Sequence, residues 1–303
     1  MVVRTLALME ESIMKRQNIT GYTFMLPALI IIGLFTVVPI IYAVVMAFNK
    51  VDIVAGTYQF NGLHNFRYLL ADEKFWAAVR NTFRYVVIVV PIQTIIALVL
   101  AAVLNNKIKF KRGFITFLFI PTLTSSAAMT LIFMWLFNAN GLGTAFLNDL
   151  LGTKINFLSD PNWALGIIMG MNIFSTVPHF MVIYLSALQE IQPNLYEAAS
   201  LDGANSLQKF FHITVPQLSP ITFYVVSMGL IGCFQIFDQA YIMSSGTGGP
   251  NNATLTFTLY IYQLAFGGNA TMGIAAALAL ILAVIIFLST FIFNKFTERE
   301  AND

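Results

Sequence analysis

Six long apolar stretches constrain this sequence more than any other feature. A helix needs about 20 mostly apolar residues to cross the hydrocarbon core of a bilayer. The stretches are separated by polar loops and lie at residues 22–48, 82–104, 114–137, 163–187, 221–243 and 272–294. Only 10% of the residues are charged, against roughly a quarter in ordinary soluble domains. The sequence therefore predicts an all-α integral membrane protein with about six transmembrane helices.

The chain divides into a polar N-terminal tail, a six-helix domain and a short C-terminal tail, at residues 1–21, 22–294 and 295–303. The first tail carries charged side chains and has no apolar run of signal-peptide length, so we expect the first span to be retained. Met14 is followed by two cations in the manner of a natural start, which makes residues 1–13 a candidate upstream extension. Prolines inside several apolar stretches predict kinked helices around a cavity.

The distribution of Lys and Arg among the loops predicts the orientation, because positive charge near membrane ends stays on the cytoplasmic side. Ten cations lie on the same side as both termini, whereas six lie on the other side. The short loop 105–112 contributes most to this asymmetry, with four cations and no acidic residue. Both termini and the loop 188–220 are therefore expected in the cytoplasm.

Loop 188–220 has the pattern of two short helices joined by a turn. Helix formers occupy 194–201 after a proline, Asp202-Gly203 is a turn signal, and residues 206–213 are expected to form a second helix that Pro216 ends. The loop is long and has few charges for a cytoplasmic segment. Its small side chains would let the backbone of another protein approach closely, and two carboxylates would give directional contacts. We interpret the loop as a docking element.

The segment Leu195–Ala204, followed by Ile213–Pro216, resembles the EAA motif of ABC importer permeases. In that family the motif forms a coupling helix that inserts into a cleft of the ATPase subunit. The resemblance therefore implies ATPase contacts for Tyr196, Glu197, Ala198, Ala199, Asp202, Gly203 and Ala204. Further segments resemble the maltose-type and glycerol-phosphate-type permeases of the carbohydrate branch, namely Gly62–Phe66, Asn81–Thr82, Leu158–Pro161, Phe234–Asp238 and Gly248–Pro250.

The resemblance also implies a fold and an assembly. The fold would be that of a type I ABC importer permease in the cytoplasmic membrane of a bacterium or archaeon. The partners would be a second, similar permease, two copies of an ATPase, and an extracytoplasmic solute-binding protein that delivers a sugar. ATP and Mg would bind to the ATPase subunits, because this chain lacks a Gly-x-x-x-x-Gly-Lys-Ser/Thr sequence. No cofactor is expected in this chain.

A polar stripe on the fourth span is the first candidate for a substrate pathway. Asn172, Ser175, Thr176 and His179 recur at i, i+3, i+4 and i+7, which places them on one helical face. Hydroxyl, amide and imidazole groups suit a neutral polyhydroxylated ligand. The alternative is that these side chains hold the fourth span to its neighbours, as small polar residues do in membrane bundles. A metal site at His179 is not expected, because no carboxylate lies at ligand spacing.

The fifth span carries a second candidate group, which consists of Gly229, Gly232, Cys233, Gln235 and Asp238. The resemblance to maltose-type permeases places this region beside the cavity. Gln235 and Asp238 are expected on one helical face because they are three residues apart. The alternative for Asp238 is a capping or pairing role, with Arg84 as the partner. The alternative for Cys233 is that of a small packing residue.

The sequence after the fifth span and the alternative functions complete the prediction. Residues 246–252 are rich in Gly, Pro and Asn and predict a break, after which the apolar run 255–266 is too short to span and is expected at the outer interface. The alternatives to a sugar importer are a permease for glycerol phosphate or a polyamine, an ion-coupled carrier, and a membrane enzyme. One intramembrane carboxylate and no catalytic grouping favour a transport subunit. The cations flank membrane ends, so no nucleic-acid partner is expected.

Overall fold

The computed structural model describes residues 22–52, 56–106, 109–268 and 271–302. Within these residues, five helices are long and apolar enough to cross a membrane, and they span Tyr22–Ala47, Glu73–Asn105, Ala164–Glu190, Ser219–Met243 and Met272–Lys295. A bent pair of helices, Lys111–Leu123 and Ser126–Leu136, makes a sixth span if it is counted as one. The prediction of a helical membrane protein with about six spans is confirmed. The N-terminal tail lies outside the described residues.

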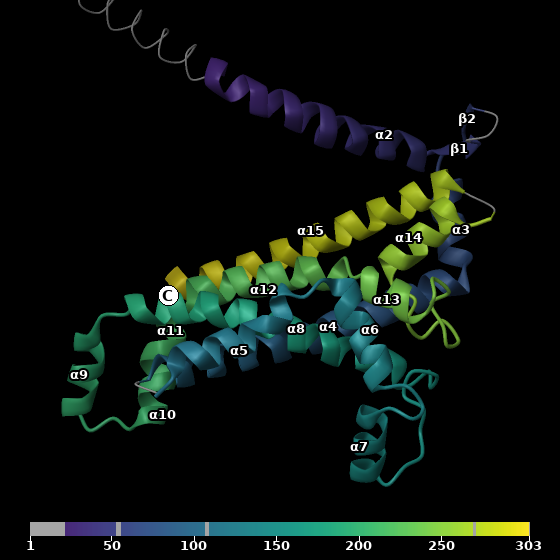
Figure 1. Cartoon of the computed structure of the whole chain (residues 1–303). Helices are drawn as coiled ribbons and strands as arrows, with labels where there is room; N and C mark the ends of the chain where they lie inside the picture. The colour runs from purple at the N-terminus through teal and green to yellow at the C-terminus, as the bar shows by residue number, and fades with distance from the viewer. Residues whose placement is uncertain (1–21, 53–55, 107–108, 269–270, 303) are drawn as a thin grey trace, which may run out of the picture.

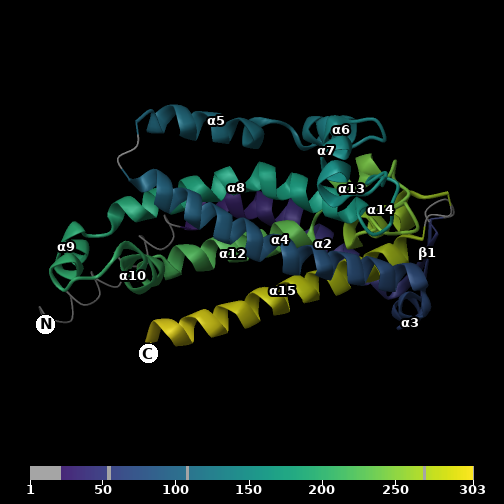
Figure 2. The ribbon, with the colours of Figure 1, turned by 90° about the horizontal axis from the view of Figure 1, so that it is seen from below.

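The spans lie side by side as an elongated bundle (Figures 1 and 2). Helix α4 (Glu73–Asn105) packs along α8 (Ala164–Glu190) and also contacts α12 (Ser219–Phe234). Helix α15 (Met272–Asn302) lies on α12, and α5 (Lys111–Leu123) lies on α8. Residues 295–302 continue the sixth helix. Helix α2 (Val38–Ala47) contacts α15, and the first span diverges from the bundle toward its N-terminal end (Figure 1).

Each end of the bundle carries a different set of short elements. One end, called the loop end, carries the segment 188–220 with α9 (Pro193–Leu201), α10 (Ser206–Lys209), η2 (Phe210–Thr214) and α11 (Val215–Gln217). The opposite end, called the hairpin end, carries β1 (Asn49–Asp52), β2 (Thr57–Phe60), α3 (His64–Ala71), α7 (Leu142–Leu151), α13 (Asp238–Met243) and α14 (Phe257–Phe266). Strands β1 and β2 pair antiparallel, with Asn49 opposite Phe60. This hairpin is a small departure from the predicted all-α fold.

The third apolar stretch is not one helix, contrary to the expectation for 114–137. Helix α5 ends at Leu123, α6 (Ser126–Leu136) begins three residues later, and their axes differ by 96°. Pro121 lies in the last turn of α5, where its missing N–H weakens the helix. Thr124 is extended, and the hydroxyl of Ser125 accepts a hydrogen bond from the backbone N–H of Ala128 at 3.3 Å. The new N-cap therefore starts a second helix in another direction.

The fifth stretch is also interrupted, because α12 ends at Phe234 and α13 begins at Asp238. The carbonyl oxygen freed at Ile236 accepts hydrogen bonds from the hydroxyls of Thr256, at 3.0 Å, and Thr258. These two residues belong to the entry of α14, so a distant segment stabilises the break. Gln235 and Asp238 are consequently not on one continuous helical face, which corrects the expectation from their spacing.

Two π-helical turns each precede a proline. In η1 (Gly33–Val37) and η2, the residue after the turn donates its backbone N–H five residues back, from Val38 to Gly33 and from Val215 to Phe210. Pro39 and Pro216 follow directly, and a proline ring clashes with the carbonyl four residues earlier. The wider turn accommodates the ring. Helical structure therefore continues past Pro216 to Gln217, which corrects the expectation that Pro216 ends the second helix of the loop.

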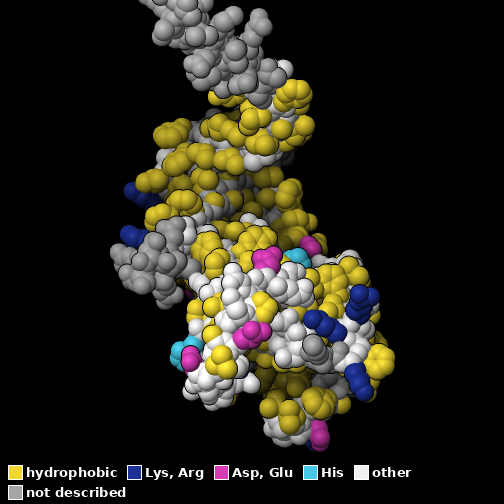
Figure 3. All heavy atoms as spheres, turned by 90° about the vertical axis from the view of Figure 1, so that its left-hand side faces the viewer, with side chains coloured by type: hydrophobic (Ala, Val, Ile, Leu, Met, Phe, Trp, Pro, Cys, Tyr) yellow, Lys and Arg dark blue, Asp and Glu magenta, His cyan; other side chains and the backbone are white. Residues whose placement is uncertain are grey.

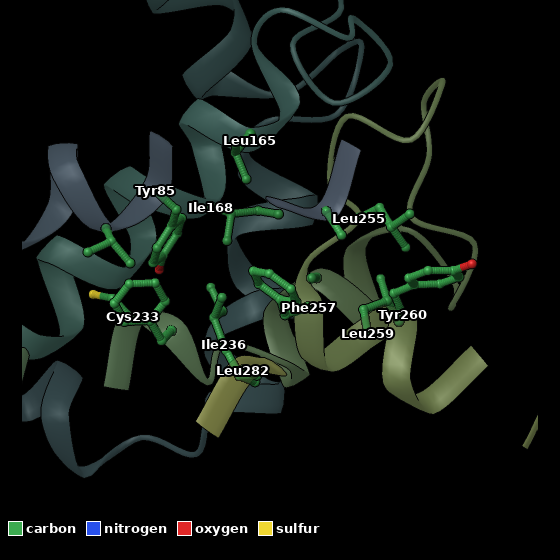
Figure 4. Packing of buried hydrophobic residues seen from close by; sticks show 14 of the residues in the cluster. Tyr85, Leu165, Ile168, Cys233, Ile236, Leu255, Phe257, Leu259, Tyr260 and Leu282 are labelled. Atoms are coloured by element: carbon green, nitrogen blue, oxygen red, sulfur yellow. The ribbon is translucent and has the colours of Figure 1, made fainter. Parts of the chain in front are cut away.

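The main hydrophobic core lies between α4, α8, α12, α14 and α15 (Figure 4). Tyr85, Ile168 and Phe257 are fully buried in it. Cys233 is 3% exposed and lies in the same core, as expected for a packing residue. The run 255–266 was expected at the outer interface. Leu255 and Leu259 are fully buried against neighbouring helices, and the position of the run at the interface stays a prediction.

The hairpin end is held together by polar side chains, and Asn65 and Thr82 among them belong to segments that carry the family resemblance. The Asn65 side-chain amide donates to the carbonyl oxygens of Ala47, at 2.8 Å, and Asn49, at 3.0 Å. The hydroxyl of Thr82 accepts from the backbone N–H of Phe257 at 3.1 Å. The hydroxyl of Tyr260 donates to the carboxylate of Asp72. These bonds fix α3 relative to the end of α2 and to β1, and the start of α4 relative to α14.

Candidate functional site

The EAA-like segment forms the predicted helix, turn and helix at the loop end. Pro193 occupies the first turn of α9, where its missing N–H is not needed. The chain reverses at Gly203, whose φ of 81° is in the left-handed region that favours glycine. A capping box then starts α10, in which Asn205 and Gln208 bond each other's backbone N–H groups at 2.9 and 2.8 Å. Local sequence therefore defines this shape.

Two side-chain bonds hold the two arms of the segment together. The hydroxyls of Tyr196 and Thr214 are 2.9 Å apart, and Thr214 is buried. The ammonium of Lys209 donates to the hydroxyl of Ser200 at 2.6 Å. The hydroxyl of Tyr184 in α8 also donates to the hydroxyl of Thr222 in α12 at 3.1 Å. The two arms of the segment are thus bonded to each other, and so are the two helices that flank it.

The predicted ATPase-coupling residues differ in exposure. The exposed ones are Glu197, Ala198, Asp202 and Gly203, and the half-buried ones are Tyr196, Ala199 and Ala204. Leu201, beside the turn, is 90% exposed. No described residue forms an ion pair or a hydrogen bond with the carboxylate of Glu197 or Asp202. Figure 3 shows this end of the molecule, where acidic and apolar side chains share the surface. The arrangement leaves two carboxylates and an apolar side chain available to a partner.

A cavity of about 280 Å³ lies at the break between α5 and α6, against α8 and α13. It is lined by Pro121, Thr122, Thr124, Ser126, Met129, Met171, Ser175, Thr176, His179 and Gln239. Three of the four residues of the predicted α8 stripe are among them. None of the described lining residues is Lys, Arg, Asp or Glu. The cavity therefore offers hydroxyl, amide and imidazole groups to a ligand that carries no net charge.

The hydrogen bonds of the α8 stripe lie within α8 or join it to α5. The hydroxyl of Thr122 donates to the carbonyl oxygen of Ser175 at 2.8 Å, so this pair holds α5 to α8. Asn172 is bonded within α8, where its side-chain oxygen accepts from Thr176 at 3.4 Å. Asn172 does not line the cavity. The side chain of His179 is exposed at the cavity, with no hydrogen bond to a described residue.

Sequence reasoning missed four polar residues of this cavity, namely Thr122, Thr124, Ser126 and Gln239. The hydroxyl of Ser126 is buried without a partner among the described residues. A signal was present, because Thr and Ser cluster at 122–126 directly after Pro121 in an otherwise apolar stretch. Such a cluster is typical of a broken membrane helix beside a cavity.

The residues predicted on the fifth span divide into two groups. Gly229 and Cys233 are buried, and a side-chain carbon added at Gly229 would lie 2.5 Å from the Gln93 amide nitrogen of α4. Gly229 therefore permits close helix packing. Gly232, Gln235 and Asp238 are exposed and do not line the cavity. Among the described residues, Asp238 forms no ion pair with Arg84, whose side chain is also exposed, so the suggested pairing is not observed.

Comparison with known proteins places these features in a family. A family profile described as "Binding-protein-dependent transport system inner membrane component" matches residues 93–301. The lactose transport system permease protein of Rhizobium radiobacter is 33% identical over 294 residues, which cover 96% of this chain and 98% of the relative. The arabinooligosaccharides transport system permease protein of Bacillus subtilis is 34% identical over 281 residues, which cover 90% and 87%.

Further similarities agree with this assignment. The sn-glycerol-3-phosphate transport system permease protein of Pectobacterium atrosepticum is 30% identical over 289 residues, 95% of this chain and 97% of the relative. Among solved structures, a bacterial alginate ABC transporter in complex with an alginate-pentasaccharide-bound periplasmic protein has a similar chain. Its TM-score is 0.80 at 23% identity, with 94% of this chain and 96% of that chain covered. Fold and sequence together show that this multi-pass membrane protein belongs to the family of binding-protein-dependent transport system inner membrane components.

Proposed function

We propose that this chain is the permease subunit of an ATP-driven importer that receives a sugar from an extracytoplasmic binding protein. It forms half of the translocation pathway and couples to the ATPase through α9 and the Asp202-Gly203 turn. The observation that carries the proposal concerns α8. This helix lines the polar, uncharged cavity, and it is followed closely in the chain by the exposed segment 193–204. Helix α8 and the two residues that follow it therefore connect the polar cavity with an exposed segment.

The coupling follows from this connection. Helix α8 ends at Glu190 and α9 begins at Pro193, so little flexible chain separates them. The Tyr196–Thr214 bond joins α9 to the arm that leads into α12, and Tyr184 joins α8 to α12. A displacement of α9 by the ATPase would thus move α8 and α12 together. His179 on α8 and Gln239 on α13 would then change their separation in the cavity.

The lining favours a neutral sugar over a charged solute. A phosphate group is commonly held by Arg or Lys, and the described lining of the cavity has neither. A sugar hydroxyl both donates and accepts hydrogen bonds, which suits the hydroxyls of Thr124 and Ser126, the amide of Gln239 and the imidazole of His179. The related proteins are described as permeases for lactose and arabinooligosaccharides, which supports this substrate class. A glycerol-phosphate permease remains the alternative.

The first span supports the proposed pairing with a second, similar permease. Its most apolar window has a mean hydropathy of 2.7, yet none of that window is buried within this chain. The span contacts α15 near Ala47 and is exposed along most of its length. We infer that the second permease covers part of it. The proposed assembly also includes two ATPase subunits, which bind ATP and Mg and contact the loop end of this chain. Both termini of this chain are expected on that same, cytoplasmic side.

Uptake of a radiolabelled sugar by the reconstituted complex tests the proposal, with lactose and an arabinooligosaccharide as substrates. Ser175→Ala and Gln239→Ala should raise the half-saturating sugar concentration about fivefold to tenfold, because each removes about one hydrogen bond to the ligand. Ser186→Ala is the matched control, since Ser186 is an exposed serine of α8 outside the cavity. Unchanged transport constants in both cavity variants would reject the pathway.

A second measurement tests the coupling residues. Glu197→Lys should reduce ATP-driven uptake at least tenfold while the permease remains folded, because it reverses the charge offered to the ATPase. Glu190→Lys makes the same exchange at the end of α8, outside α9, and should have a smaller effect. Equal loss in the two variants, or full uptake with Glu197→Lys, would contradict the role of α9. Cysteine labelling of Asp202→Cys in sealed cells tests the orientation, and reagent access from the external medium would overturn it.

A further inference from the structure

A second cavity, of about 670 Å³, lies at the loop end between the last two turns of α4 and the α10–η2 arm. Its apolar lining residues include Val99, Val103 and Phe210. Its polar lining residues include Asn105, Asn106, Ser206 and Lys209. The cavity is therefore amphipathic, and its volume lies in the range of small-molecule sites, roughly 300–1,000 Å³.

The position of this cavity along α4 matches the boundary between hydrocarbon and headgroups. Helix α4 is a membrane-spanning helix that ends at Asn105. Its last turns, from Val99 to Asn105, therefore reach the level at which polar side chains begin. The apolar side of the cavity faces the level of acyl chains, and the polar side faces the level of headgroups. Phe211 is 61% exposed and Leu207 is 69% exposed at the rim, as in segments that lie in the interface.

Among the described residues that line the cavity, the charge has one sign. Lys209 is the only charged side chain among the described lining residues. Three further described cations, Lys109, Lys111 and Arg112, lie within six residues of Asn106 along the chain. No described acidic residue lines the cavity. Figure 3 shows a group of Lys and Arg side chains on the right-hand side of this end of the molecule and others on its left-hand edge. Lys209 has three N–H donors and uses one on Ser200, so others are available to an anion.

We propose that this cavity binds an anionic phospholipid, with the phosphate beside Lys209 and the acyl chains along Val99, Val103 and Phe210. The lipid contacts Tyr196 and Thr214, whose hydroxyls join the two arms of the EAA-like segment. A bound lipid therefore braces the segment that is proposed to couple to the ATPase. This inference goes beyond the proposed function and does not depend on which solute is transported.

Native mass spectrometry of the full chain, purified in detergent, tests the site directly. The probes are phosphatidylglycerol and phosphatidylcholine with identical acyl chains. The wild-type chain should retain phosphatidylglycerol preferentially, and Lys209→Gln should weaken its binding about fivefold, as expected for the loss of one cation near a membrane surface. Lys295→Gln removes an exposed cation of α15 that does not line the cavity, and it should leave retention unchanged.

A second variant keeps the test decisive if Lys209→Gln does not fold. Leu207→Ser changes an exposed apolar residue of the rim and should weaken retention of both lipids while the elution volume of the protein stays the same. Equal retention of the two lipids, or wild-type retention in both variants, would overturn the proposal. Release of phosphatidylglycerol by inorganic phosphate would identify a site for a free anion instead. Its loss on addition of the ATPase subunits would identify a protein interface.

Discussion

Hydrogen bonds from Asn81 hold the loop after α13 against α4. The substitution Asn81→Ala tests how much these bonds stabilise the closed form of that loop. The side-chain amide of Asn81 donates to the carbonyl oxygens of Asn252, at 2.7 Å, and Leu255, at 3.0 Å. Asn81 is 8% exposed and Leu255 is fully buried. The substitution removes both donors and leaves two carbonyl oxygens without them.

The two oxygens contribute unequally to the expected effect. Asn252 is half-buried, so water can replace the lost donor there. Leu255 is buried, and an unsatisfied buried acceptor costs about 1–3 kcal/mol. We therefore expect the free energy of opening this loop to fall by about 2 kcal/mol. Because about 1.4 kcal/mol corresponds to a factor of ten, the open population should rise about thirtyfold.

Hydrogen–deuterium exchange of the protein in lipid nanodiscs measures this opening. Thr254 and Phe257 report it, because their backbone N–H groups donate to Gly248 and to Thr82, both at 3.1 Å. Their exchange should accelerate about thirtyfold in Asn81→Ala, the factor worked out for the opening equilibrium. Asn106→Ala is the control, since Asn106 is exposed and bonds only carbonyls of its own helix. Unchanged exchange in Asn81→Ala, or equal acceleration in the control, would refute the reasoning.

Three further substitutions test other parts of the structure. Gly203→Ala should destabilise the turn by about 1–2 kcal/mol through its positive φ alone, and faster tryptic cleavage after Lys209 would report it. Gly229→Leu should lower the melting temperature in detergent by overpacking α4 against α12, at about 1–3 kcal/mol, whereas Gly232→Leu, with open space around it, should not. Burial and the neighbouring Asp72 raise the pKa of Tyr260, so the folded state keeps this proton longer than the unfolded state. Wild-type stability should fall as pH rises above about 10, and Tyr260→Phe should lack that part of the loss in thermal unfolding scans.

The two cavities lie on segments that the proposed ATPase contact would involve. The polar cavity lies at the break of the third span, and the amphipathic cavity lies against the EAA-like segment. Both border α8 or its continuation, the first through Ser175 and the second through Leu188 and Tyr196. A movement of α9 that also displaced α8 would therefore shift residues that line both cavities.

The number of spans and the shape of segment 193–217 follow from local sequence. Hydropathy over about 20 residues is sufficient to identify a membrane helix, because each span must satisfy its own backbone in lipid. The proline at 193, the Asp202-Gly203 turn and the Asn205 capping box each act within one or two helical turns. The family resemblance rests on these same local residues and also indicated the correct fold.

Only the tertiary structure decided where the fifth span breaks and which polar residues meet. The break after Phe234 depends on hydroxyls of Thr256 and Thr258, about 20 residues away. Helix packing separated Gly229, buried against Gln93, from exposed Gly232, although both lie on one apolar stretch. Periodicity predicts which residues share a helical face, but the neighbour that covers each face is selected by contacts between segments distant in the chain.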